Sequence, residues 1–178
     1  SYVGIDDTTS LSFTTGDTVE PILTSSDPAD NEIDVAVDSN IVLTFSEVVD
    51  VETGNIVIYK TSDDSVVETI DVTSNQVTGS GTNQITINPT NDLESLTEYY
   101  LKIDATAFDD PSGNSYAGIS DTTSLSFTTP DIIPPTLTSS VPADDATAVA
   151  EESNIVLNFS EDVEVANGNI VIYKTSDN

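Results

Sequence analysis

We predict an all-β fold in which two-sheet Greek-key sandwiches follow one another along the chain. Three observations lead to this prediction. Blocks of sequence recur at a fixed offset, segments of alternating polarity are separated by turn residues, and no amphipathic helix of useful length appears. The apolar residues are mostly Val, Ile, Leu, Tyr and Phe, which favour strands over helices.

The sequence repeat has a period of 114 residues. The heptapeptide Gly-Asn-Ile-Val-Ile-Tyr-Lys at 54–60 returns at 168–174, and 168 − 54 = 114. With this offset the whole of 1–64 aligns with 115–178 without a gap. The period is too long for a solenoid unit and suits one independent β-domain.

Proline-bearing linkers recur at 17–21 and 131–135 and mark the domain boundaries. We expect residues 1–16 to be the C-terminal strand of a preceding repeat. Residues 17–130 are expected to form a complete domain with its leading linker. Residues 131–178 are expected to form the linker and N-terminal half of the next repeat. The cut then falls inside domains, as in an internal fragment of a longer chain.

Period-two alternation between turns predicts seven or so strands in the complete domain, which is the pattern of an immunoglobulin-like Greek-key sandwich. A short helical turn is expected at 105–108. The expected strands are 21–26, 40–46, 55–60, 66–72, 76–79, 84–88, 98–104 and 124–129. The expected core residues are Leu43, Phe45, Ile56, Ile58, Ile85, Ile87, Tyr100, Ile103, Leu125 and Phe127.

Several motifs together resemble one known family. They are the Pro-Ala-Asp turn at 28–30, Ser-Asn-Ile-Val-Leu-Thr-Phe-Ser-Glu at 39–47, the Gly-Asn turn at 113–114 and the closing Ser-Phe-Thr-Thr at 126–129. In this order and spacing they resemble bacterial Ig-like domains of the type found in S-layer and large adhesin-type surface proteins. The resemblance implies extracellular or cell-surface tandem modules that serve as stalks, spacers or adhesive surfaces.

The composition disfavours several classes of function. Three lysines oppose 32 acidic residues, a net charge of −29, so the chain should repel nucleic acids and anionic membranes. No apolar run approaches the ~20 residues of a membrane helix, so we expect no direct membrane insertion. Without His or Cys the usual general bases and nucleophiles cannot be built, and we expect no enzyme.

The acidic residues favour a bound cation instead. Ca²⁺ takes six to eight oxygen ligands, usually from loops, and the incoming linker and two loops should meet at one pole of the sandwich. The alternative is that these residues only form turns and a solvated acidic surface. The linker supplies Asp17, and the loop after the expected strand 40–46 supplies Glu47 and Asp50. The loop after the expected strand 98–104 supplies the other candidate ligands, Asp104, Asp109, Asp110 and Asn114. In the next repeat Asp131 and Glu161 occupy the positions of Asp17 and Glu47.

The hypothesis that follows is a non-catalytic extender module whose interdomain poles are stiffened by Ca²⁺. Its partners would be the neighbouring Ig-like repeats of the same chain. Two alternatives remain open at this stage. One is a self-assembling extracellular filament or surface-layer subunit, joined by strand addition. The other is a module that itself binds a surface glycan or protein, which would call for an exposed aromatic or apolar patch.

Overall fold

The computed structural model describes residues 3–9 and 11–174, and it divides into two units. Unit 1 is Ser1–Ile132 and unit 2 is Ile133–Asn178. The strand predicted at 1–16 and the half-domain predicted at 131–178 include residues 1–2, 10 and 175–178, which lie outside the described residues. The described residues form strands, turns and irregular segments, with no helix that could cross a membrane.

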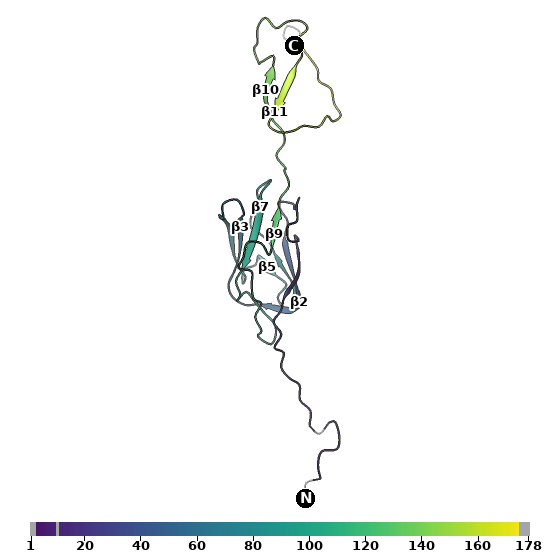
Figure 1. Ribbon diagram of the computed structural model, residues 1–178, viewed down its shortest axis with the longest axis vertical. Coiled ribbons are helices and arrows are strands. Elements are labelled where there is room, and N and C mark those ends of the chain that lie inside the picture. The colour runs from purple at the N-terminus through teal and green to yellow at the C-terminus, as the bar shows by residue number, and fades with distance from the viewer. Residues whose placement is uncertain (1–2, 10, 175–178) are drawn as a thin grey trace. The chain divides into compact units, whose positions relative to one another are not determined.

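Unit 1 contains two antiparallel sheets, whose strands β2, β3, β5, β7 and β9 are labelled in Figure 1. The first sheet has the order β1-β2-β6-β5, from β1 (Leu23–Asp27), β2 (Ile41–Val51), β6 (Thr82–Ile87) and β5 (Val77–Thr78). The second sheet has the order β4-β3-β7-β9, from β4 (Val66–Asp71), β3 (Asn55–Lys60), β7 (Glu98–Ile103) and β9 (Ser126–Thr128). The predicted all-β, immunoglobulin-like sandwich is therefore confirmed.

The core lies between the inner faces of these sheets. Along β3 the residues alternate, so that Ile56 and Ile58 are fully buried while Val57 and Tyr59 are only partly buried. All ten expected core residues are buried. Tyr100 differs from the other nine, because its ring stacks on the ring of Tyr59 at a centroid distance of 4.9 Å and does not join the core cluster.

The helical turn expected at 105–108 is only partly present. Residues 105–106 form a turn, in which the backbone N–H of Ala107 donates a 3.0 Å hydrogen bond to the carbonyl oxygen of Asp104, but an additional strand, β8 (Phe108–Asp109), begins at residue 108. Phe108 pairs with Val51 at the end of β2, and the Phe108 side chain is fully buried. Its ring lies 5.5 Å from the ring of Phe45, which also meets the ring of Tyr116 at 5.2 Å. Burial of this aromatic group holds 108–109 against the end of β2.

Strand β2 also runs farther than expected, from Ile41 to Val51. The register against β6 shifts between Thr44 and Val49, which marks a bulge or irregularity. Glu47 and Asp50 therefore belong to the distal end of a long strand, and the prediction that they lie in a loop is wrong.

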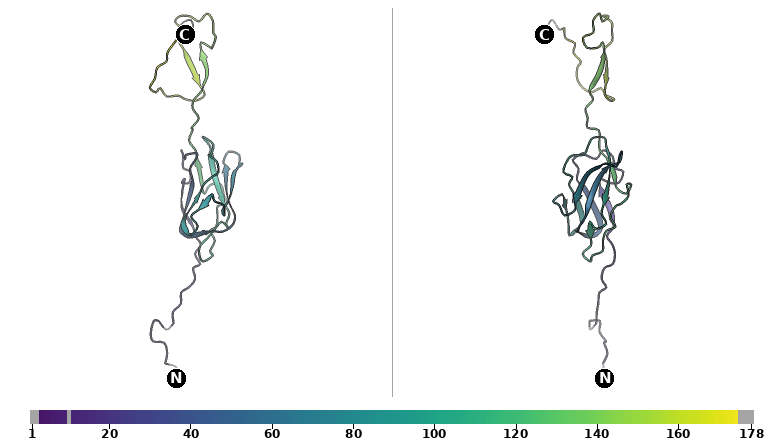
Figure 2. Two further views of the ribbon diagram at one scale, coloured as in Figure 1. Left: turned by 180° about the vertical axis from the view of Figure 1, so that it is seen from behind. Right: turned by 90° about the vertical axis from the view of Figure 1, so that its left-hand side faces the viewer.

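The described part of unit 2 contains one antiparallel strand pair, which Figure 2 shows from two sides. It is formed by β10 (Leu137–Val141) and β11 (Val156–Phe159). The register pairs Leu137 with Phe159, as Leu23 pairs with Phe45 in unit 1, and the same irregularity follows the first pair. The described residues of this unit are almost all exposed.

Candidate metal centre

Three carboxylates from separate parts of unit 1 meet at one place. Asp17 precedes β1, Glu47 lies in the distal half of β2, and Asp110 directly follows β8. One oxygen of each side chain lies within 4.8 Å of an oxygen of the other two. Pairing of β8 with the end of β2 brings Asp110 close to Glu47. We call Asp17, Glu47 and Asp110 the carboxylate trio.

Asp110 is the most firmly held member of the trio, and it is only 3% exposed. Its Oδ1 accepts hydrogen bonds from the backbone N–H groups of Ser112 and Asn114, both at 2.8 Å. Its Oδ2 accepts a hydrogen bond of 2.7 Å from Nδ2 of Asn114. Burial raises the pKa of Asp110, but the hydrogen bonds from Asn114, Ser112 and Gly113 outweigh it and leave the pKa below its usual value. The carboxylate is therefore both charged and fixed.

Glu47 shows the opposite electrostatic effect. Burial, followed by the negative charges of Asp17 and Asp110, raises the pKa of the Glu47 carboxyl. Asp17 accepts a 3.0 Å hydrogen bond from the backbone N–H of Val19, which fixes its side chain within the linker. A charged Glu47 in this position is disfavoured by its like-charged neighbours unless a cation joins them.

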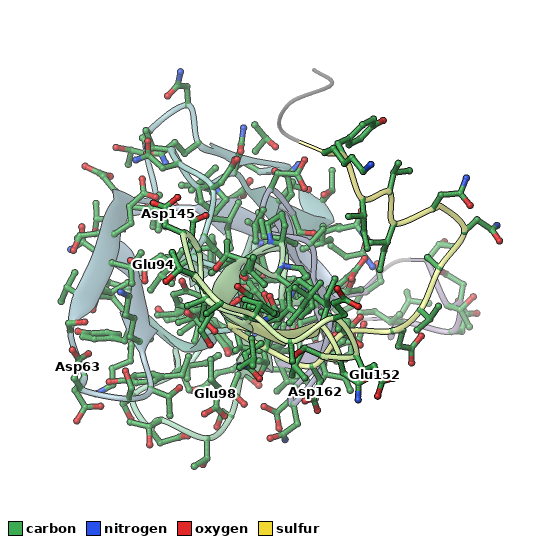
Figure 3. All side chains as sticks on the ribbon, turned by 90° about the horizontal axis from the view of Figure 1, so that it is seen from above. Asp63, Glu94, Glu98, Asp145, Glu152 and Asp162 are labelled. Carbon is green, nitrogen blue, oxygen red and sulfur yellow. The ribbon has the colours of Figure 1, made fainter. Side chains whose placement is uncertain are left out.

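The lysines of unit 1 are engaged elsewhere. Lys60 forms a 2.7 Å ion pair with Glu94, and Nζ of Lys102 lies 5.5 Å from the ring centroid of Tyr59. Acidic side chains such as Asp63 and Glu98 also cover the outside of unit 1 (Figure 3), but these are exposed and scattered. Within the described residues the trio is the one place where three carboxylates come this close.

The other candidate ligands have different roles in the structure. Asp50 lies opposite Asp109 in the β2–β8 pair, and Oδ1 of Asp50 accepts a 3.4 Å hydrogen bond from Ser80. Oδ2 of Asp104 accepts a 2.8 Å hydrogen bond from the backbone N–H of Asn55, at the start of β3. Asn114 orients Asp110 through hydrogen bonds, as described above.

The two candidates from the following repeat belong to different units. Asp131 lies next to the last residue of unit 1, where its Oδ1 accepts a 3.5 Å hydrogen bond from Ser95, and Glu161 lies in unit 2. The sequence analysis did not predict the hydrogen bonds that Ser112 and Asn114 donate to Asp110. The Asp-Pro-Ser-Gly-Asn spacing at 110–114 was the signal for that tight loop.

The trio can act as a ligand set for a hard cation. It supplies only oxygen atoms, which suits Ca²⁺ or Mg²⁺ and disfavours metals that prefer nitrogen or sulfur. Three carboxylates are fewer ligands than the six to eight of a Ca²⁺ ion, so carbonyls or water would complete the shell.

Comparison with solved structures finds similarity to two proteins. CopC from Methylosinus trichosporium OB3b is 12% identical over 64% of this chain and 97% of its own, with a TM-score of 0.41. The S-layer protein rSbsC(31-844) is 18% identical over 68% of this chain and 16% of its own, with a TM-score of 0.40. At these values neither likeness bears on what the chain binds. No curated protein sequence matches it.

The family comparison is more informative. The model of the bacterial Ig-like domain matches residues 17–129 and again residues 131–178. Such a domain is a structural fold, compatible with a module of a surface protein. With a matching sandwich and two matches that together cover most of its length, the chain belongs to the bacterial Ig-like domain family.

Proposed function

We propose that the chain is a non-catalytic extender module of a large extracellular repeat protein, of the adhesin or surface-layer type, at the bacterial surface. In this proposal Ca²⁺ bound by the carboxylate trio stiffens the linker where it enters the domain. The observation that carries the proposal is the distance of at most 4.8 Å between carboxylate oxygens of Asp17, Glu47 and Asp110.

The position of Asp17 gives the cation a mechanical role. Asp17 is exposed and lies in the linker, while Asp110 is buried and held by its own loop. A cation bound by both carboxylates would connect the linker, through Asp17, to the loop that holds Asp110. The linker would then lose bending freedom without a large protein interface.

Mutual repulsion within the trio supports a cation at this place. Because the pKa of Glu47 is raised, its ionisation is harder in the folded chain than in the unfolded chain. Near pH 7 the ionised form of Glu47 therefore opposes folding, and this opposition disappears as the pH falls below the normal pKa of 4.5. A bound divalent cation would reverse this effect, since it interacts with all three charges in the folded state alone.

Thermal unfolding of the full chain tests the proposal, with Ca²⁺, with Mg²⁺ and with a chelator at one ionic strength. At a Ca²⁺ concentration a hundredfold above Kd, mass action adds about 2.7 kcal/mol to the unfolding free energy. For a domain of this size we expect Tm to rise by roughly 11 °C. Equal curves in all three conditions would refute the calcium site and leave a plain spacer.

Two glutamate variants distinguish the trio from general charge screening. Glu47→Gln removes one trio charge, and we expect the Tm difference between Ca²⁺ and chelator to shrink strongly. Glu98→Gln is the control, because Glu98 is also a glutamate on a strand but lies exposed in β7, outside the trio. If both variants lose the same part of the Ca²⁺ response, the cation acts on the whole acidic surface and the trio is not its site.

A further inference from the structure

A polar hollow of about 420 Å³ opens on unit 1, away from the carboxylate trio. Three segments line it: the turn before β2 at 37–39, the turn before β5 at 75–76, and the segment after β6 at 88–92. Small-molecule sites occupy about 300–1,000 Å³, so the hollow is large enough for a small ligand.

One wall of the hollow is held by a partly buried carboxylate. Glu68, in β4, accepts hydrogen bonds from Oγ1 of Thr90 at 2.6 Å, from the backbone N–H of Thr90 at 3.0 Å and from Nε2 of Gln76 at 2.8 Å. The hydrogen bonds outweigh burial and lower the pKa of Glu68, so it stays charged. The segments on either side of the hollow are therefore fixed to one strand.

A second set of contacts joins the same two segments directly. The backbone N–H of Asn88 donates a 2.8 Å hydrogen bond to the carbonyl oxygen of Gln76. In return, Nε2 of Gln76 donates a 3.0 Å hydrogen bond to the carbonyl oxygen of Asn88. This network orients Gln76 before any ligand arrives, which is what a binding site needs from its supporting residues.

The remaining side chains of the hollow are free to bind. Asp38, Asn75, Asn91 and Asp92 are exposed, and within the described part of the chain their side chains have no hydrogen-bond partner. Each carboxamide offers two donors and an acceptor, and each carboxylate offers acceptors only. No basic or aromatic residue lines the hollow, which disfavours recognition of anions and of flat aromatic ligands.

From this chemistry we infer that the hollow binds a neutral saccharide of one or two sugar units. Each sugar hydroxyl both donates and accepts a hydrogen bond, which matches a mixture of carboxamides and carboxylates. A cationic ligand would need acceptors only, and it would leave the carboxamide donors of Asn75 and Asn91 unused. Without an aromatic ring to stack on the sugar, the affinity should be weak, with Kd on the order of 1 mM.

The inference does not depend on Ca²⁺, because no trio residue lines the hollow. The test is an NMR titration of the full chain labelled with ¹⁵N. The neutral probes are glucose, galactose, mannose and N-acetylglucosamine, each raised to about 10 mM, roughly ten times the expected Kd of about 1 mM. Spermidine and Ca²⁺ are titrated separately as cationic probes.

We expect at least one sugar to shift the amide resonances of 75–76 and 88–92. Asn75→Ala and Asn91→Ala should each weaken that sugar's binding by about tenfold, the factor that corresponds to one lost hydrogen bond of ~1.4 kcal/mol. Asn83→Ala is the matched control, since Asn83 is an exposed asparagine in β6 outside the hollow, and it should bind normally.

Three results would overturn the inference. The first is that none of the four sugars shifts these resonances. The second is that the shifts persist unchanged in Asn75→Ala and Asn91→Ala. The third is that spermidine or Ca²⁺ shifts them while the sugars do not, which would make the hollow a cation site.

Discussion

Phe127 and Phe13 stand in the same hexapeptide sequence, but Phe127 is buried and Phe13 is exposed. Ser-Leu-Ser-Phe-Thr-Thr stands at 10–15 and again at 124–129. Phe127, in β9, is 1% exposed, and its ring lies 5.9 Å from the ring of Tyr99, whereas Phe13 is 86% exposed. Replacing each phenylalanine by alanine therefore makes one chemical change in two environments.

The expected magnitudes differ by about an order of magnitude. Removal of a fully buried Phe side chain costs about 3–5 kcal/mol, from lost burial and the cavity left behind. A domain is stable by about 5–15 kcal/mol, so Phe127→Ala removes a large part of that margin. For a domain of this size the loss corresponds to a fall in Tm of roughly 12–20 °C. Phe13→Ala should change the unfolding free energy by less than about 0.5 kcal/mol.

The assay is unfolding of the full chain by heat and by guanidinium chloride, followed by far-ultraviolet circular dichroism. Both variants and the parent chain are measured under the same conditions, in chelator, so that bound cations do not contribute. If Phe13→Ala destabilised the chain as much as Phe127→Ala, Phe13 would be buried in solution and the assignment of the exposed segment would be refuted. A negligible effect of Phe127→Ala would refute the core.

Two further predictions concern the loops. Hydrogen bonds from the Ser124 hydroxyl and the Thr123 backbone lower the pKa of Asp121 from 3.8 to about 2, so its ionised form stabilises the fold above the unfolded pKa. The stability difference between the parent and Asp121→Asn should therefore be constant above pH 5 or so and vanish as the pH falls to about 2, in denaturant unfolding at a series of pH values. Gly79→Ala should be more destabilising than Gly113→Ala in the same assay. Both glycines have positive φ, which costs about 1–2 kcal/mol for alanine, but only at Gly79 would the added Cβ collide with the Gln84 carbonyl oxygen.

The strands were predictable from sequence because their side-chain pattern directly reflects burial. The strand β3 was predicted with its observed bounds, and β4, β6 and β7 to within two residues. In β3 and β6 inward-facing isoleucines alternate with outward residues, and this alternation is visible without a structure. The sequence repeat also indicated where each motif stands in the domain.

The β8 strand was not predictable in the same way. It is two residues long, and a strand of that length carries no period. Its position depends on the burial of Phe108 against Phe45 and on pairing with Val51. Both contacts join segments far apart in the sequence, so local pattern could not reveal them. The same limit applies to Phe13 and Phe127, whose neighbours in sequence are identical.

The candidate site was predicted in part, for a related reason. The rule that the incoming linker and alternate loops share a pole placed Asp17, Glu47 and Asp110 in one group, and these three do meet. The same rule could not separate them from Asp50, Asp104 and Asp109. That separation depends on which oxygens are already used, such as the Asp104 oxygen that accepts from Asn55, and on the side of β2 and β8 from which each side chain projects.

The trio and the aromatic cluster of the core form one continuous structure. Glu47 stands two residues after Phe45, and Asp110 stands two residues after Phe108, whose ring packs against that of Phe45 at 5.5 Å. The spacing of the two carboxylates thus depends on the packing of two buried rings. Phe45→Leu would keep an apolar side chain but lose the ring contacts with Phe108 and Tyr116. We expect it to weaken the Ca²⁺-dependent rise in Tm as well as the stability in chelator, because metal ligands that are assembled by folding couple binding to folding. An unchanged Ca²⁺ response in a destabilised Phe45→Leu chain would show that the core does not set the distance between the two carboxylates.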